Sequence, residues 1–117
     1  LEPIAYVASQ AAERTIRRLG AERLTTRRVP VIFVAEEARG LLGSFVSAIS
    51  GGNLYRKSSF LLDHLNKPIF PSHIKLDERP HLAKALGSAP FDDDGVATRN
   101  NVFVDEGILR SYVLGVY

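Results

Sequence analysis

The chain has 117 residues, of which 45% are hydrophobic and 24% charged, a composition typical of one domain with a modest core. Its formal net charge of +2 comes from 15 basic and 13 acidic residues, a balance too weak to indicate a nucleic-acid-binding protein by itself. No apolar run approaches the roughly 20 residues of a membrane helix, so we expect no membrane association. The absence of cysteine excludes disulfides and thiolate metal sites, and it fits a cytoplasmic protein.

Residues 3–19 predict an amphipathic helix. Apolar side chains recur at three- and four-residue steps, Pro3 suits the first turn and Gly20 suits the end. The residues around the end of this helix are strongly basic, and we assign 1–28 to a helix and a basic connection. The arginines are Arg14, Arg17, Arg18, Arg23, Arg27 and Arg28.

Residues 29–66 predict a strand–helix–loop–helix core. The run VPVIFV at 29–34 is typical of a buried strand, and 35–50 carry an apolar stripe at helical spacing. Two interior glycines, Gly40 and Gly43, weaken that helix, so we expect another backbone to approach them closely. Gly51 and Gly52 should end the helix, and 58–66 should form a short helix with a serine N-cap.

Residues 67–117 predict a strand-rich part. We expect short strands at 69–70 and 73–77, a turn at Asp93–Gly95, and a hairpin of 102–104 with 108–116. The fold class is therefore α+β, with helices packed on a mixed or antiparallel sheet and a C-terminal β-hairpin.

The stretch from Pro30 to Phe60 resembles the core of the TldD/PmbA family, whose two related subunits form a zinc metalloprotease. In the TldD-type subunit a His-Glu-x-x-x-His pattern precedes Gly-Leu-x-Gly, and the second element is present here as GLLG at 40–43. The two histidine positions hold Val34 and Arg39, and the glutamate position holds Ala35. Valine and alanine have no ligand atom, and arginine repels a cation. This departure resembles the PmbA (TldE) type of subunit.

The resemblance implies a single segment, 1–117, from the interior of a larger PmbA/TldD-like fold. It implies a non-catalytic subunit with no cofactor or metal in this chain, whose TldD-like partner carries zinc. The two subunits would form a cleft that admits unfolded peptides for proteolysis or peptide maturation, and the chain alone would form a homodimer. Two alternatives remain open: a stand-alone metallohydrolase with ligands outside these residues, and a DNA gyrase-modulating protein that uses the basic N-terminal quarter.

The rest of the sequence gives little support for a metal site elsewhere in the chain. His64, His73 and His81 are nine and eight residues apart, and none forms an i,i+4 pair. The acidic run 92–94 lacks the alternating acids of an EF-hand loop, and we expect a turn that holds a loop. The resemblance also covers this GSAPFDDDG block.

The best binding candidates lie between 51 and 60. Paired glycines let a ligand backbone approach, and a basic pair follows them. We expect peptide or partner contacts from Gly51, Gly52, Arg56, Ser58, Ser59 and Phe60. The hairpin edge at 102–116 is a second candidate, because extended peptides add to open sheet edges.

Overall fold

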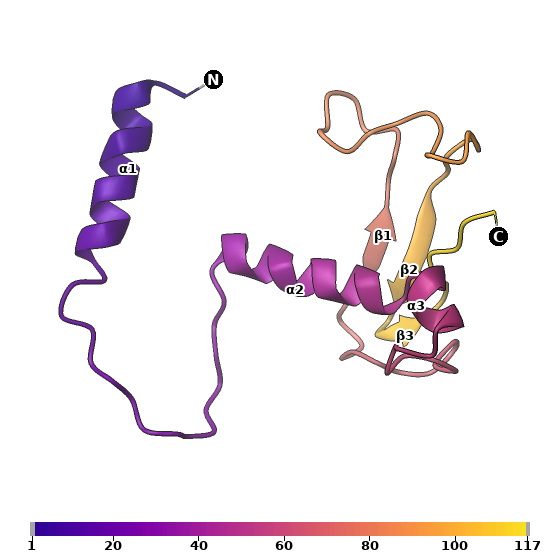
Figure 1. Ribbon diagram of the computed structural model, residues 1–117, viewed down its shortest axis with the longest axis horizontal. Coiled ribbons are helices and arrows are strands. Elements are labelled where there is room, and N and C mark those ends of the chain that lie inside the picture. The colour runs from indigo at the N-terminus through magenta and orange to yellow at the C-terminus, as the bar shows by residue number, and fades with distance from the viewer. Residues whose placement is uncertain (1, 117) are drawn as a thin grey trace. The chain divides into compact units, whose positions relative to one another are not determined.

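The computed structural model describes residues 2–116, so residues 1 and 117, the ends of the expected 1–117 segment, lie outside it (Figure 1). The elements run in the order α1, α2, α3, β1, β2, β3. They divide into two compact units, residues 1–32 and residues 33–117, and each is described by itself.

The first unit consists of α1 (Ile4–Ile16) and an irregular connection. The helix expected at 3–19 is thus confirmed with a shorter end, since 17–20 form turns and Gly20 adopts a φ of 73°. None of the α1 residues is buried.

The strand expected at 29–34 is wrong. These residues form no strand, and their large side chains are exposed, up to 97% for Ile32. A strand exists only when a neighbour accepts its backbone hydrogen bonds, and no such neighbour lies among the described residues. Residues 29–34 therefore have the side chains typical of a strand but no neighbouring strand with which to pair.

In the second unit, a three-stranded antiparallel sheet has the order β1-β2-β3. Its strands are β1 (Leu76–Glu78), β2 (Asn101–Asp105) and β3 (Ile108–Leu109). The hairpin is confirmed, and its two-residue turn has φ values of 49° at Glu106 and 76° at Gly107. Positive φ at both positions is typical of a type I′ turn, whose twist matches the flanking strands.

The helix α2 (Ala35–Ala48) covers this sheet with its C-terminal half only. Phe45 and Ile49 are buried with Leu61, Val104 and Leu109 in the core. Phe70 meets the Phe45 ring edge-on with centroids 5.4 Å apart. These contacts confirm the α+β class, with a purely antiparallel sheet.

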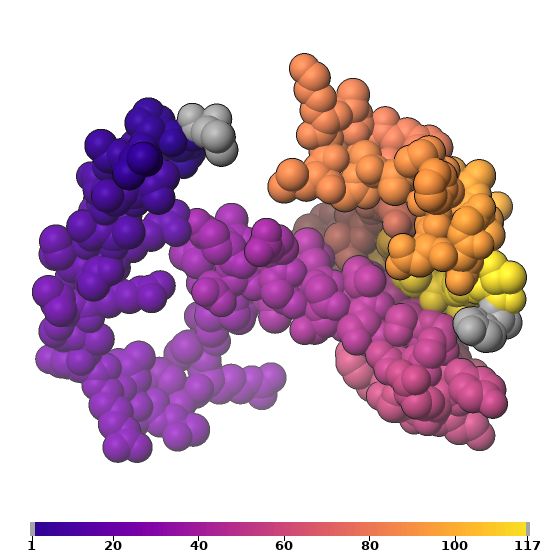
Figure 2. Space-filling view, turned by 45° about the horizontal axis from the view of Figure 1, so that its top comes forward, coloured from indigo at the N-terminus to yellow at the C-terminus, as the bar shows by residue number. Residues whose placement is uncertain are grey.

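The N-terminal half of α2 extends past the sheet (Figures 1 and 2). The stripe side chains Leu41 and Leu42, in the middle of the helix, are 52% and 48% exposed. The close backbone approach expected at Gly40 and Gly43 is wrong, because a Cβ at either position would meet no described atom within 4 Å. Gly40 lies in the N-terminal half of the helix, and Gly43 lies two residues before the buried Phe45.

The helix expected at 58–66 is also wrong, and the segment is a series of turns. Asp63 and Asn66 adopt φ values of 60° and 62°, which a right-handed helix forbids. Ser59 caps only one turn, by accepting the Leu61 amide at 3.0 Å.

Three strand expectations need shorter or different bounds. The 69–70 strand is reduced to an isolated bridge of Pro68 to Ile108, and the 73–77 strand begins at Leu76. The 108–116 strand ends at Leu109, after which Val113 forms a parallel bridge with Ser50. The chain thus leaves the sheet and passes beside the end of α2.

The turn expected at Asp93–Gly95 is present, and Gly95 has a φ of 77°. The Asp92 carboxylate accepts the amides of Asp94 and Val96, at 3.0 and 2.8 Å, and so holds the loop.

None of the helices found between residues 2 and 116 is both long enough and apolar enough to cross a bilayer.

Candidate functional site

The glycine pair does not end α2, as the sequence had indicated, but begins the short helix α3 (Gly51–Tyr55). The α2 helix ends three residues earlier, and the backbone bends at Ser50, whose ψ of 140° is extended. The Gly51 amide then donates to the Val113 carbonyl at 2.7 Å, and the Val113 amide donates to the Ile49 carbonyl at 3.0 Å. These two bonds fix the C-terminal segment against the start of α3.

Position 51 leaves little room for a side chain. A Cβ at position 51 would lie 3.3 Å from Leu114 Cδ2 and 3.4 Å from the Val113 oxygen, closer than most real Cβ contacts. The missing side chain therefore allows the two backbones to lie side by side.

A hollow of about 800 Å³ opens where α3 meets the C-terminal segment, and we call it the α3 hollow. This volume lies within the range of small-ligand sites. Two large side chains stand on its wall largely uncovered, Tyr55 at 90% exposure and Leu114 at 70%. The hollow is lined by Gly51, Gly52, Leu54, Tyr55, Leu114 and Gly115.

Arg56 is not a lining residue of the hollow, but its guanidinium lies beside Gly52, which is one. One guanidinium nitrogen donates to Asn53 Oδ1 at 2.9 Å, and Asn53 Nδ2 in turn donates to the Ser47 carbonyl at 2.7 Å. The two terminal nitrogens lie 3.5 and 3.6 Å from the Cβ position of Gly52, which lines the hollow. No carboxylate among residues 2–116 pairs with Arg56. Asn53 therefore orients the Arg56 guanidinium, and no described carboxylate compensates its charge.

The other candidates from the sequence lie away from the hollow. Ser59 Oγ donates to the Ala48 carbonyl at 2.6 Å, and Ser58 Oγ donates to the Asn53 carbonyl at 3.2 Å, so both hydroxyls hold the chain after α3. Phe60 is 79% exposed and does not line the hollow. Sequence reasoning missed Leu114, because only the non-local bridge to Ser50 brings the C-terminal segment here. Tyr55 lies inside the predicted 51–60 stretch but was not among its expected contact residues.

The degenerate motif lies at the start of α2. Val34 is the N-cap residue, Ala35 opens the helix and Arg39 follows one turn later, all three exposed. Their side chains offer a cation no lone pair, so these positions do not fit zinc. Two histidines make other bonds: His64 Nδ1 lies 2.8 Å from the Leu62 carbonyl, and His81 Nε2 lies 3.0 Å from Thr98 Oγ1. Among residues 2–116 no group of three or more His, Cys, Asp or Glu side chains is placed to hold a metal ion.

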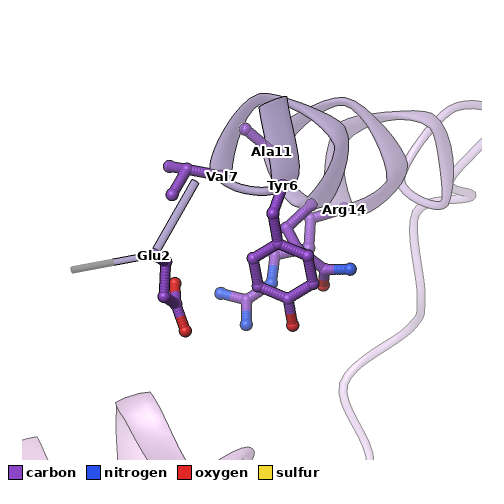
Figure 3. Close-up of a pocket in the computed structure, with 6 residues that line it drawn as sticks. Glu2, Tyr6, Val7, Ala11 and Arg14 are labelled. Atoms are coloured by element: carbon purple, nitrogen blue, oxygen red, sulfur yellow. The ribbon is translucent and has the colours of Figure 1, made fainter. Parts of the chain in front are cut away.

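The first unit has a hollow of its own, about 400 Å³ along α1 (Figure 3). Tyr6, Gln10 and Arg14 recur there at four-residue steps, with Glu2, Val7 and Ala11 beside them. Since every one of these residues belongs to α1 or lies within two residues of its start, the hollow is a groove along one helix.

Residues 26–117 match the family described as the PmbA/TldA metallopeptidase C-terminal domain. The chain belongs to the PmbA/TldD family. It is 47% identical to the metalloprotease PmbA homolog of Haemophilus influenzae, over 96% of this chain and 25% of that protein. The chain thus spans about a quarter of the length of the curated PmbA relatives that it matches.

Solved structures place the chain in the same PmbA/TldD fold. A candidate modulator of DNA gyrase from Bacteroides thetaiotaomicron has a TM-score of 0.84 and 35% identity, over 89% of this chain and 24% of that one. TldE from Thermococcus kodakarensis has a TM-score of 0.55 and 28% identity, over 60% of this chain and 16% of that one. The resemblance stated from the sequence and the α+β class are both confirmed.

Proposed function

We propose that this chain belongs to the non-catalytic subunit of a TldD-like zinc metalloprotease. The observation that carries the proposal is the side-chain chemistry at the start of α2, where Val34, Ala35 and Arg39 stand. A zinc peptidase needs ligand atoms and a general base, and these three side chains supply neither. The metalloprotease names of the PmbA relatives and the likeness to TldE support the assignment.

In this proposal a TldD-like partner supplies the zinc and its ligands, and this chain helps to shape the cleft that admits unfolded peptide. The α3 hollow, which Gly51 and Gly52 help to line, is the part of the chain best suited to touch peptide, with Arg56 beside Gly52. Ser58 and Ser59 act indirectly, because their hydroxyls hold the backbone that follows α3. Phe60 is exposed and suits a contact with the partner subunit. We propose a cytoplasmic location.

Metal content and activity test this function in the full-length protein that contains this segment. We expect no stoichiometric zinc in the isolated subunit by elemental analysis, and peptidase activity only after a TldD-like subunit is added. Stoichiometric zinc together with peptidase activity in the isolated subunit would instead establish a stand-alone metallohydrolase.

Arg39→Ala provides a sharper control in the two-subunit complex. The Arg39 side chain is exposed in α2 and makes no ion pair that the described residues show, so peptidase activity should stay within about twofold. A loss of activity with an unchanged yield of complex would place Arg39 in the chemistry and contradict the proposal.

The gyrase-modulating alternative makes a different prediction. It rests on the arginines near the end of α1 and on the description of the Bacteroides relative. Under this alternative the subunit binds DNA with a salt-dependent affinity that is lost when four arginines become glutamine. Those residues are Arg17, Arg18, Arg27 and Arg28.

A further inference from the structure

The exposed turn at residues 92–95 contains an aspartate followed directly by a glycine, Asp94–Gly95. It is the only place in the sequence where an aspartate or an asparagine precedes a glycine. An aspartyl carboxyl group can react with the backbone amide of the next residue, and a side chain on that next residue hinders the attack. Glycine has no side chain, so this peptide bond is the most reactive of its kind in the chain.

The structure leaves both reacting groups accessible. Asp94 and Gly95 are exposed, and no described atom lies within 4 Å of the Cβ position of Gly95. The backbone of such an exposed loop tip is among the least constrained parts of a domain. The hairpin turn is the contrast, because Gly107 also follows an acid, Glu106, but is buried against backbone oxygens.

Two hydrogen bonds hold the turn in a conformation that does not react. The Gly95 amide donates to the Asp92 carbonyl at 3.0 Å. The Asp94 Oδ2 accepts the Val116 amide at 3.3 Å and lies 3.2 Å from the Cβ position of Gly115. The first bond engages the attacking amide, and the second keeps the carboxylate beside the C-terminal segment. Because exposed bonds of this kind open locally at little cost, they slow the reaction without preventing it.

We propose that Asp94 is a site of spontaneous isomerisation to isoaspartate. The Gly95 nitrogen attacks Asp94 Cγ, the bond from Cγ to its hydroxyl oxygen breaks, and the amide proton leaves with that oxygen as water. The product is a succinimide ring. Water then adds to a ring carbonyl, and opening at the backbone carbonyl sends the main chain through the former side-chain carbon. The water that is lost is regained, so the reaction needs no other co-reactant.

The isomerisation changes the surroundings of the α3 hollow. The main chain gains a methylene group between Asp94 and Gly95, and the free carboxylate moves to a new position. The bond from the Val116 amide is then lost, and with it the link between this turn and the C-terminal segment. That segment contributes Leu114 and Gly115 to the lining of the hollow. The age of the protein is thereby coupled to the shape of the hollow.

Ageing of the full-length protein that contains this segment tests the site. The protein is kept at neutral pH and physiological temperature for several weeks and is then digested with trypsin, which releases residues 85–99 as one peptide. Enzymatic methylation of the free isoaspartyl carboxyl measures the product, and electron-transfer fragmentation locates it. We expect isoaspartate to accumulate at Asp94, several-fold more slowly than in a synthetic 85–99 peptide, which lacks the bond from Val116.

A matched pair of variants decides the assignment. Asp94→Glu keeps the charge but must close a larger ring, so the isoaspartate signal should disappear. Asp93→Glu changes the neighbouring exposed acid and leaves the Asp94–Gly95 bond intact, so the signal should remain. Far-UV circular dichroism verifies that both variants are folded, which we expect because both side chains are exposed.

A third variant tests the restraint. Val116→Pro removes the amide that donates to Asp94, so it should raise the rate of isomerisation several-fold. No isoaspartate in the aged protein, or a signal that survives Asp94→Glu, would overturn the site, and an unchanged rate in Val116→Pro would overturn the restraint. These measurements involve neither zinc nor a TldD-like partner, so their outcome is independent of the proposed function.

Discussion

At the scale of single residues, Gly107 carries the strongest constraint in the second unit. It is buried in the hairpin turn, its carbonyl accepts the amides of Ile69 and Phe70, and its amide donates to the Ile74 carbonyl. A Cβ there would lie 2.2 Å from the Phe70 oxygen and 2.7 Å from the Pro71 oxygen. Because both neighbours are backbone atoms, no side-chain rotation can relieve the overlap.

Gly107→Ala should therefore lower the free energy of unfolding by about 3 kcal/mol or more, through steric overlap and left-handed strain together. Gly95→Ala is the matched control, since Gly95 has nearly the same φ and nothing within 4 Å of its Cβ position. It should lose only about 1 kcal/mol. Urea denaturation measures both, and equal losses would show that strain alone matters.

At the scale of elements, the turns at 58–66 are joined to the C-terminal segment by one phenol. Tyr112 Oη donates to the Leu61 carbonyl at 2.8 Å and accepts the His64 amide at 3.1 Å. Both bonds are partly buried. A segment with no regular secondary structure is thus held in part by side-chain bonds to backbone groups, beside backbone bonds such as that from the Asn66 amide to the Leu109 carbonyl at 2.8 Å.

Tyr112→Phe removes both bonds and leaves the two backbone groups without that partner, so we expect a loss of about 1–2 kcal/mol in unfolding free energy. Tyr55→Phe removes a hydroxyl from a residue that is 90% exposed and should change stability by less than about 0.5 kcal/mol. Thermal melts of the two variants compare them directly. A Tyr112→Phe variant as stable as the unchanged chain would contradict this account.

The same elements show what the sequence could predict. The α1 and α2 helices and the hairpin follow from local periodicity and turn residues, and all three were found. The strand predicted at 29–34 does not form because no described strand pairs with it. The helix predicted at 58–66 does not form because Asp63 and Asn66 adopt left-handed backbone conformations. Of the site, the glycines and Arg56 were identified locally. Tyr55 and Leu114 could not be paired, because a bridge between distant segments brings them together.

At the scale of the whole molecule, much apolar surface is uncovered on α2. Leu41, Leu42 and Val46 are between 44% and 52% exposed. They belong to the same apolar stripe as Phe45 and Ile49, which are buried in the core. Contiguous apolar patches of this kind usually mark an interface. The chain studied alone should therefore self-associate as its concentration rises.

Light scattering coupled to size-exclusion chromatography tests this expectation. The double variant Leu41→Gln with Leu42→Gln should shift the apparent mass toward the monomer, with little change in helix content. Leu86→Gln removes an equally apolar exposed side chain outside α2 and should leave the mass unchanged. A chain that is monomeric at every concentration would show that the stripe is not self-complementary.

The Tyr112 hydroxyl also bears on the order in which the second unit folds. Its bond to Leu61 joins residues 51 positions apart, whereas the Glu106–Gly107 turn joins immediate neighbours. Closing a long loop costs more chain entropy than forming a hairpin, which takes about 1–10 μs. The hairpin should thus form first, and the bond from Tyr112 should form late, after the core has brought the two segments together. Tyr112→Phe should then speed unfolding and leave the folding rate almost unchanged.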